Sequence, residues 1–152
     1  MHPIEKWRGE IPVRSQYTAG VAGQKFFAAL KRSGELLASR CPTCNQVYLP
    51  ARLFCERCFA ELTEEVSVKP AGIVRSFTIC YAGLEGQRLD QPYALALVEL
   101  DGATTLLLHR VLDIDDPSKI SIGTRVELLL KPASERLGSI LDIEGFRVVK
   151  SI

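Results

Sequence analysis

Apolar side chains recur at helical spacing early in the chain. In the segment GQKFFAALKRSG, Leu30 follows Phe27 by three residues and Phe26 by four, so all three fall on one side of a helix. Gly34 ends the segment, and glycine is typical of a helix stop. The pattern predicts one α-helix over roughly residues 22–33.

Later segments follow strand spacing instead. Five of them read as strands: GIVRSFTICY, PYALALVEL, TTLLLHRVL, RVELLLK and GFRVVK. In the first, we expect Ile73, Phe77, Ile79 and Tyr81 to share one face, which Arg75 interrupts. The second is apolar at nearly every position, which is typical of a strand covered on both sides.

The connections between these segments favour one topology. Asp101-Gly102 predicts a tight hairpin between the second and third strands. The longest connection, DIDDPSKISIG, lies between the third and fourth strands, as in an OB-fold barrel. Another small Greek-key barrel remains the alternative, and in either case the chain is mainly β.

Composition and charge narrow the class of protein. The 152 residues weigh 16.8 kDa and are 47% hydrophobic, which suits one domain or two small ones. A net charge of +1 lacks the basic excess of proteins that neutralise many phosphates. With no apolar run of about 18 residues and no signal-peptide pattern at the amino end, we expect a cytoplasmic protein without membrane contact.

Four cysteines form two CxxC pairs, Cys41 with Cys44 and Cys55 with Cys58. Paired cysteines in a cytoplasmic protein indicate a metal site or a redox group, because disulfides rarely persist there. Two such turns can close a tetrahedral site of four sulfurs around a structural zinc ion. A redox role is less favoured because both pairs flank hairpin-like segments. Iron sites use the same cysteine spacing, so iron remains the alternative metal.

The same segments predict the organisation of the whole chain. Residues 1–21 read as an extended arm, residues 22–64 as the helix plus a rubredoxin-like zinc ribbon, and residues 65–152 as a five-stranded OB-fold barrel. Asn45, directly after the first CxxC pair, suits the left-handed backbone of a zinc knuckle, whereas Phe59, after the second, does not.

Taken together, these segments resemble one known family. It is the zinc-ribbon plus OB-fold family long catalogued as a domain of unknown function. The matching stretches are KFFAALKRSGELLASRCPTC, YLPARLFCERC, GIVRSFTICY, ALALVELDG and IGTRVELLLKP, in that order. The resemblance runs from Tyr17 to about Phe146.

The resemblance implies a non-catalytic accessory or scaffold subunit. Members of that family look like partners of thiolase-like or other acyl-CoA enzymes, and some of them bind the CoA thioester. Arg52 and Arg75 are then the expected contacts for the CoA phosphates, with Arg40 and Arg88 as further candidates. Open sheet edges also make self-association as a homo-oligomer a possibility to test.

The residues favour two other functions less. A nucleic-acid-binding OB module would use exposed aromatics such as Phe77, Tyr81 and Tyr93, but the balanced charge argues against it. An independent enzyme is not expected, because the chain has only His2 and His109 as histidines and lacks any G-x-S-x-G or phosphate-loop motif.

Overall fold

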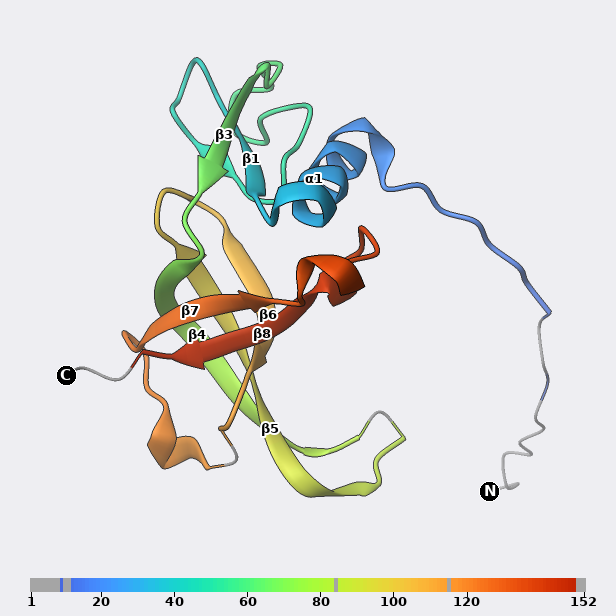
Figure 1. Ribbon diagram of the computed structural model, residues 1–152, viewed down its shortest axis with the longest axis vertical. Helices are drawn as coiled ribbons and strands as arrows, with labels where there is room; N and C mark the ends of the chain where they lie inside the picture. Colours follow the sequence, from blue (N-terminus) through green and yellow to red (C-terminus); the bar gives the residue numbers. More distant parts are fainter. Residues whose placement is uncertain (1–8, 10–11, 84, 115, 150–152) are drawn as a thin grey trace, which may run out of the picture.

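The computed structural model describes residue 9 and residues 12–149, except 84 and 115. Residues 1–8, 10 and 11 of the predicted arm, His2 among them, lie outside the described residues. Residues 12–19 form neither helix nor strand, and Figure 1 shows them leaving the amino end of the helix and running away from the body. None of the helices in the described part is long and apolar enough to cross a membrane.

The helix α1 spans Gly20–Ser33, two residues earlier at its start than predicted. Phe26 and Leu30 are fully buried, which confirms the apolar side expected from their spacing. Gly34 adopts a left-handed conformation with φ 73°, and its N–H donates to the carbonyl of Leu30. Glycine takes this conformation without a Cβ penalty, so it ends the helix.

A small three-stranded sheet follows the helix. It consists of β1 (Leu36–Arg40), β2 (Val47–Tyr48) and β3 (Glu64–Val68), in the order β2-β1-β3 and antiparallel throughout. The strand β3 returns from beyond the second CxxC pair to lie beside β1. This sheet therefore holds both cysteine turns between its strands.

The remaining strands close into a barrel. They are β4 (Ala71–Ala82), β5 (Arg88–Leu100), β6 (Leu106–Val111), β7 (Arg125–Leu130) and β8 (Ile143–Val148). Their order is β4-β5-β6-β8-β7, and β7 pairs back with β4. All neighbours are antiparallel except β6 and β8. This is the five-stranded OB-fold that the connections predicted.

Three short 3₁₀ helices occupy the connections: η1 (Pro117–Lys119), η2 (Ala133–Glu135) and η3 (Ile140–Asp142). The carboxylate of Asp142 is 1% exposed and accepts backbone N–H groups from Leu137, Gly138 and Ser139. Burial alone would raise the pKa of Asp142, but these donors outweigh it and hold that pKa below its usual range. The Asp142 carboxylate thereby stabilises the turn before β8.

The β4 side chains that point into the core differ from those predicted. Val74 is fully buried in the core, and a bulge between Val74 and Ser76 then reverses the alternation. Because of this reversal, Phe77 and Ile79 pack against the same core as Val74, whereas Ile73 does not. The expectation that Ile73 and Phe77 share a face is wrong.

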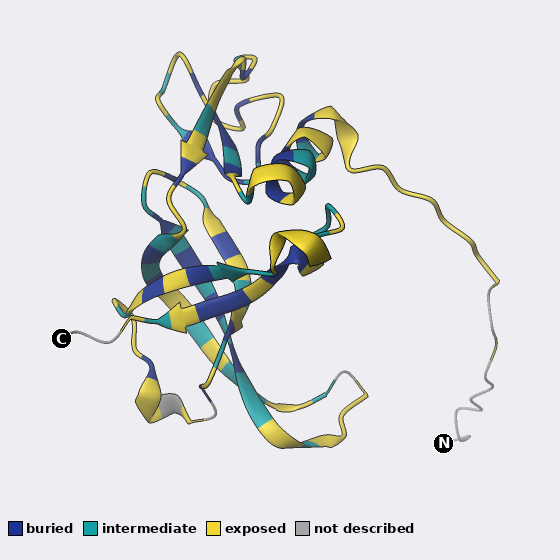
Figure 2. Ribbon diagram, viewed as in Figure 1, coloured by how far each residue is buried: buried dark blue, intermediate teal, exposed yellow. Residues whose placement is uncertain are grey.

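Two threonines join the ribbon to the barrel. Thr104 and Thr105, just before β6, each accept a backbone N–H and donate to a backbone carbonyl, Thr104 to Val47 and Thr105 to Leu49. The four bonds measure 2.9–3.0 Å. Figure 2 shows buried residues continuing from the barrel strands into α1 and β1, so one core spans both parts.

Candidate metal centre

The two CxxC pairs form two turns of the same kind. In the first, Asn45 donates its N–H to the carbonyl of Cys41 at 3.0 Å, and in the second Phe59 donates to Cys55 at 3.0 Å. Asn45 and Phe59 both lie in the left-handed region, with φ 57° and 60°. The expectation for Asn45 is confirmed, and Phe59 adopts the same turn although phenylalanine is poorly suited to it.

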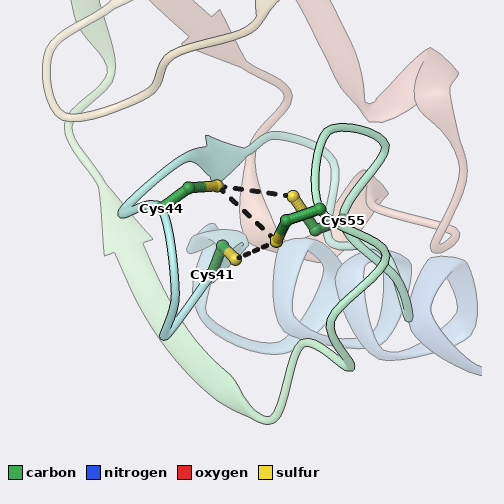
Figure 3. A group of neighbouring side chains, drawn as sticks. Cys41, Cys44 and Cys55 are labelled. Carbon is green, nitrogen blue, oxygen red and sulfur yellow. Dashed lines mark hydrogen bonds between the residues drawn. The ribbon is translucent and has the colours of Figure 1, made fainter.

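The four sulfurs converge on one point. Their distances are 3.4 Å between Cys41 and Cys58, 3.5 Å between Cys44 and Cys55, and 3.9 Å between Cys44 and Cys58. All four lie within 4.8 Å of one another, and in Figure 3 the labelled side chains of Cys41, Cys44 and Cys55 point toward one another. A tetrahedron with zinc–sulfur bonds of about 2.3 Å has edges of about 3.8 Å, so the set fits a zinc ion.

This donor set leaves no coordination position open for catalysis at the metal. Four thiolates complete the tetrahedral coordination of zinc, and a catalytic zinc keeps one position open for water or substrate. Cys41 and Cys55 are buried, Cys44 is half-buried and Cys58 is exposed. The site therefore suits a structural ion that holds the ribbon together.

One residue of the site, Tyr48, was not predicted from the sequence. Tyr48 lies on β2, is 1% exposed, and its hydroxyl is 3.2 Å from the sulfur of Cys55. The hydrogen bond to Cys55, together with burial, raises the pKa of Tyr48 to about 12. Because a thiolate that binds a metal carries no proton, the hydroxyl is the donor in this hydrogen bond when the site is occupied. The one signal in the sequence is that Tyr48 lies between Val47 and Leu49, so in an extended segment its side chain faces the opposite side from theirs.

The two arginines expected at CoA phosphates lie in different parts of the molecule. Arg52 belongs to the ribbon, where it bonds Glu56 at 2.6 Å and lies over the ring of Tyr48 at 5.1 Å. Arg75 lies on β4 of the barrel and bonds Glu99 at 2.7 Å. Each guanidinium thus has a carboxylate partner of its own.

The aromatics considered for nucleic-acid stacking do not form one platform. Phe77 is half-buried against the core, Tyr81 is 52% exposed, and Tyr93 stacks with the guanidinium of Arg110 at 4.8 Å. His109 is half-buried on β6, and burial lowers its pKa, followed by the charge of Arg110. Its Nδ1 has no hydrogen-bond partner among the described residues.

The outer side of β5 and β6 instead carries leucines. Ala94, Ala96 and Val98 face the core, so the intervening residues of β5 face outward. Leu97 lies directly opposite Leu108 in the register, and the Leu106 and Leu108 side chains are 42% and 57% exposed. We call this surface the leucine face; its members are Leu95, Leu97, Leu106 and Leu108.

Known proteins match both parts of the chain. Residues 28–64 match the family described as the rubredoxin-like zinc ribbon domain of ChsH2, and residues 65–131 match its C-terminal OB-fold domain. A DUF35 domain-containing scaffold protein of Methanothermobacter thermautotrophicus is 28% identical over 101 residues, which cover 66% of this chain and 74% of that protein.

Two solved structures share the fold. A DUF35-family protein of unknown function from Sulfolobus solfataricus has a TM-score of 0.64 and 28% identity, over 85% of this chain and 84% of that one. The Ltp2-ChsH2(DUF35) aldolase has a TM-score of 0.62 and 25% identity, over 88% of this chain and 98% of that one. With a zinc ribbon and an OB-fold matched in sequence and in structure, the chain belongs to the ChsH2-type zinc-ribbon and OB-fold family, also known as DUF35.

Proposed function

We propose that this chain is a cytoplasmic, non-catalytic scaffold subunit that binds a structural zinc ion and docks on a thiolase-like or other acyl-CoA enzyme. One relative is named a scaffold protein, and one similar structure pairs a ChsH2 domain with Ltp2 in an aldolase. The closed set of four sulfurs supports a structural role for the metal.

The observation that carries the docking proposal is the leucine face. In OB-folds, the strands corresponding to β5 and β6 commonly form the ligand-binding side. Nucleic-acid binders place aromatics and cations there. Here, exposed leucines occupy the position instead. Such a surface suits a protein partner better than single-stranded nucleic acid.

Contact with acyl-CoA is the finer part of the proposal. Arg52 and Arg75 each carry five N–H donors and use part of them on a carboxylate, so further donors remain for a phosphate. Heat released on titration of the isolated chain with acetyl-CoA, reduced in Arg75→Gln, would support the contact. No heat at millimolar ligand would leave only the scaffold role.

Co-expression with the partner enzyme tests the docking. We expect Leu108→Lys to abolish co-purification, while Ile122→Lys, a 69% exposed position in the connection before β7, leaves it intact. Retention of the partner by a folded Leu108→Lys variant would rule out the leucine face. Turnover of an acyl-CoA substrate by this chain alone would overturn the non-catalytic assignment, and salt-dependent retention on single-stranded DNA would favour the nucleic-acid alternative.

A further inference from the structure

The four sulfurs of the metal centre differ in the hydrogen bonds they accept. Cys55 accepts three: from the backbone N–H groups of Arg57 and Cys58, and from the hydroxyl of Tyr48. The residue is 1% exposed. Its sulfur is therefore surrounded by donors and screened from solvent.

Cys58 is the opposite case. It accepts the backbone N–H of Ala60, and it is the one exposed ligand of the four. Cys41 is buried and Cys44 is half-buried. The two turns have the same backbone hydrogen bond, and the Tyr48 hydroxyl at Cys55 makes their sulfurs unequal.

These differences bear on reactivity. A thiolate is the nucleophilic form of cysteine, and oxidation follows thiolate character and exposure. A hydrogen bond to a sulfur ligand draws electron density from it and occupies a lone pair, so each donor lowers nucleophilicity. Cys58 is the exposed ligand, whereas Cys55 is 1% exposed and its sulfur is also bonded by the hydroxyl of Tyr48.

We propose that Cys58 is the site at which the metal centre reacts with hydroperoxides, and that Tyr48 is a positioning residue that directs the reaction there by protecting Cys55. The Cys58 sulfur attacks one peroxide oxygen, so an S–O bond forms and the O–O bond breaks. The sulfur is oxidised to a sulfenate, and the peroxide is reduced to an alcohol, or to water from hydrogen peroxide.

A second step follows from the distances. The sulfur of Cys41 lies 3.4 Å from that of Cys58, closer than the 3.9 Å from Cys44. The sulfenate takes up a proton from water, and the Cys41 thiolate then attacks the sulfenic acid sulfur, so that an S–S bond forms and hydroxide leaves. Two of the four ligands are then lost, and the ribbon releases its metal. The barrel does not take part, so this reaction is independent of the docking proposed above.

The sequence makes the experiment direct. Trypsin cleaves after Arg52 and Arg57, which places Cys55 in LFCER and Cys58 in a separate peptide. The zinc-loaded full chain is treated with limiting hydrogen peroxide, the remaining thiols are alkylated, and the peptides are quantified while a chromogenic chelator records zinc release. We expect Cys58 to be oxidised about tenfold faster than Cys55, the factor that one hydrogen bond to a charged group is worth.

Variants test each half of the proposal. Tyr48→Phe removes one hydroxyl and is expected to bring the Cys55 rate close to that of Cys58, whereas Tyr93→Phe in the barrel leaves the ratio unchanged. Cys58→His keeps a metal ligand but removes the reactive sulfur, so peroxide-driven zinc release slows. Equal or faster oxidation of Cys55 in the unmodified chain overturns the proposal. An unchanged ratio in zinc-loaded Tyr48→Phe overturns the role of Tyr48.

Discussion

A valine in place of Thr105 would measure how firmly the ribbon is attached to the barrel. The hydroxyl of Thr105 accepts the N–H of Leu49 at 2.9 Å and donates to its carbonyl at 3.0 Å. Valine has nearly the same shape but makes neither bond. Since Leu49 is 3% exposed, water cannot easily replace the lost partner.

The expected cost follows from these contacts. A buried polar group left without a partner costs about 1–3 kcal/mol. Burial of the additional methyl group of valine offsets up to about 0.8 kcal/mol of this cost. We therefore expect Thr105→Val to lower the free energy of unfolding by about 1–2 kcal/mol. Thr104→Val should cost less, because Thr104 is exposed and the carbonyl of Val47 keeps the backbone N–H of Thr104 as a donor.

Urea unfolding of the zinc-loaded protein, followed by circular dichroism, measures this difference. With a slope of about 2 kcal/mol per molar urea, the midpoint should fall by about 0.5–1 M. Thr78→Val is the matched control, because Thr78 is an exposed strand residue and the same change there should stay within about 0.5 kcal/mol. Equal midpoints for Thr105→Val and Thr78→Val would refute the reasoning.

Three further predictions concern the metal and two turns. Cys41→Ser, or excess chelator, should remove zinc and unfold the ribbon, because metal binding supplies roughly 10–16 kcal/mol to such sites; an unchanged melting temperature after confirmed metal loss would contradict this. Asp142→Asn should cost about 1.5–3 kcal/mol at pH 7, since three backbone donors lose a charged acceptor. The pKa of Asp142 is lowered on folding, so its contribution is full above the unfolded value of about 3.9 and is lost as the pH falls through the lower folded value. Urea midpoints of variant and parent should accordingly converge at acid pH, and a constant gap would argue against the carboxylate. Phe59→Gly should raise the melting temperature by relieving a left-handed residue whose side chain is 81% exposed, worth about 1 kcal/mol; a lower melting temperature would mean that the side chain contributes packing.

Several features could be read from the sequence because they depend on neighbouring residues. The spacing of Phe26 and Leu30, closed by Gly34, was enough for the helix. Asp101-Gly102 was enough for the hairpin between β5 and β6. The CxxC spacing similarly indicated one closed site, because two residues between cysteines allow both sulfurs to face a common point.

Other features needed contacts between distant segments. The bulge after Val74 is a register shift in the pairing of β4 with β5, and no alternation pattern within β4 records it. The hydroxyl of Tyr48 on β2 meets the sulfur of Cys55 in the second cysteine turn, which the sequence does not indicate. Thr105 meets Leu49 across 56 positions of sequence.

The sequence by itself determined which segments are helix or strand, where the hairpin turns, and that four sulfurs can hold one metal ion, because these properties arise from local spacing and side-chain type. The tertiary structure alone decided which sulfur is protected, how the ribbon is attached to the barrel, and that leucines occupy the outer side of β5 and β6. Each of these depends on which distant backbone and side-chain groups face one another once the chain has closed, and local patterns carry no record of that.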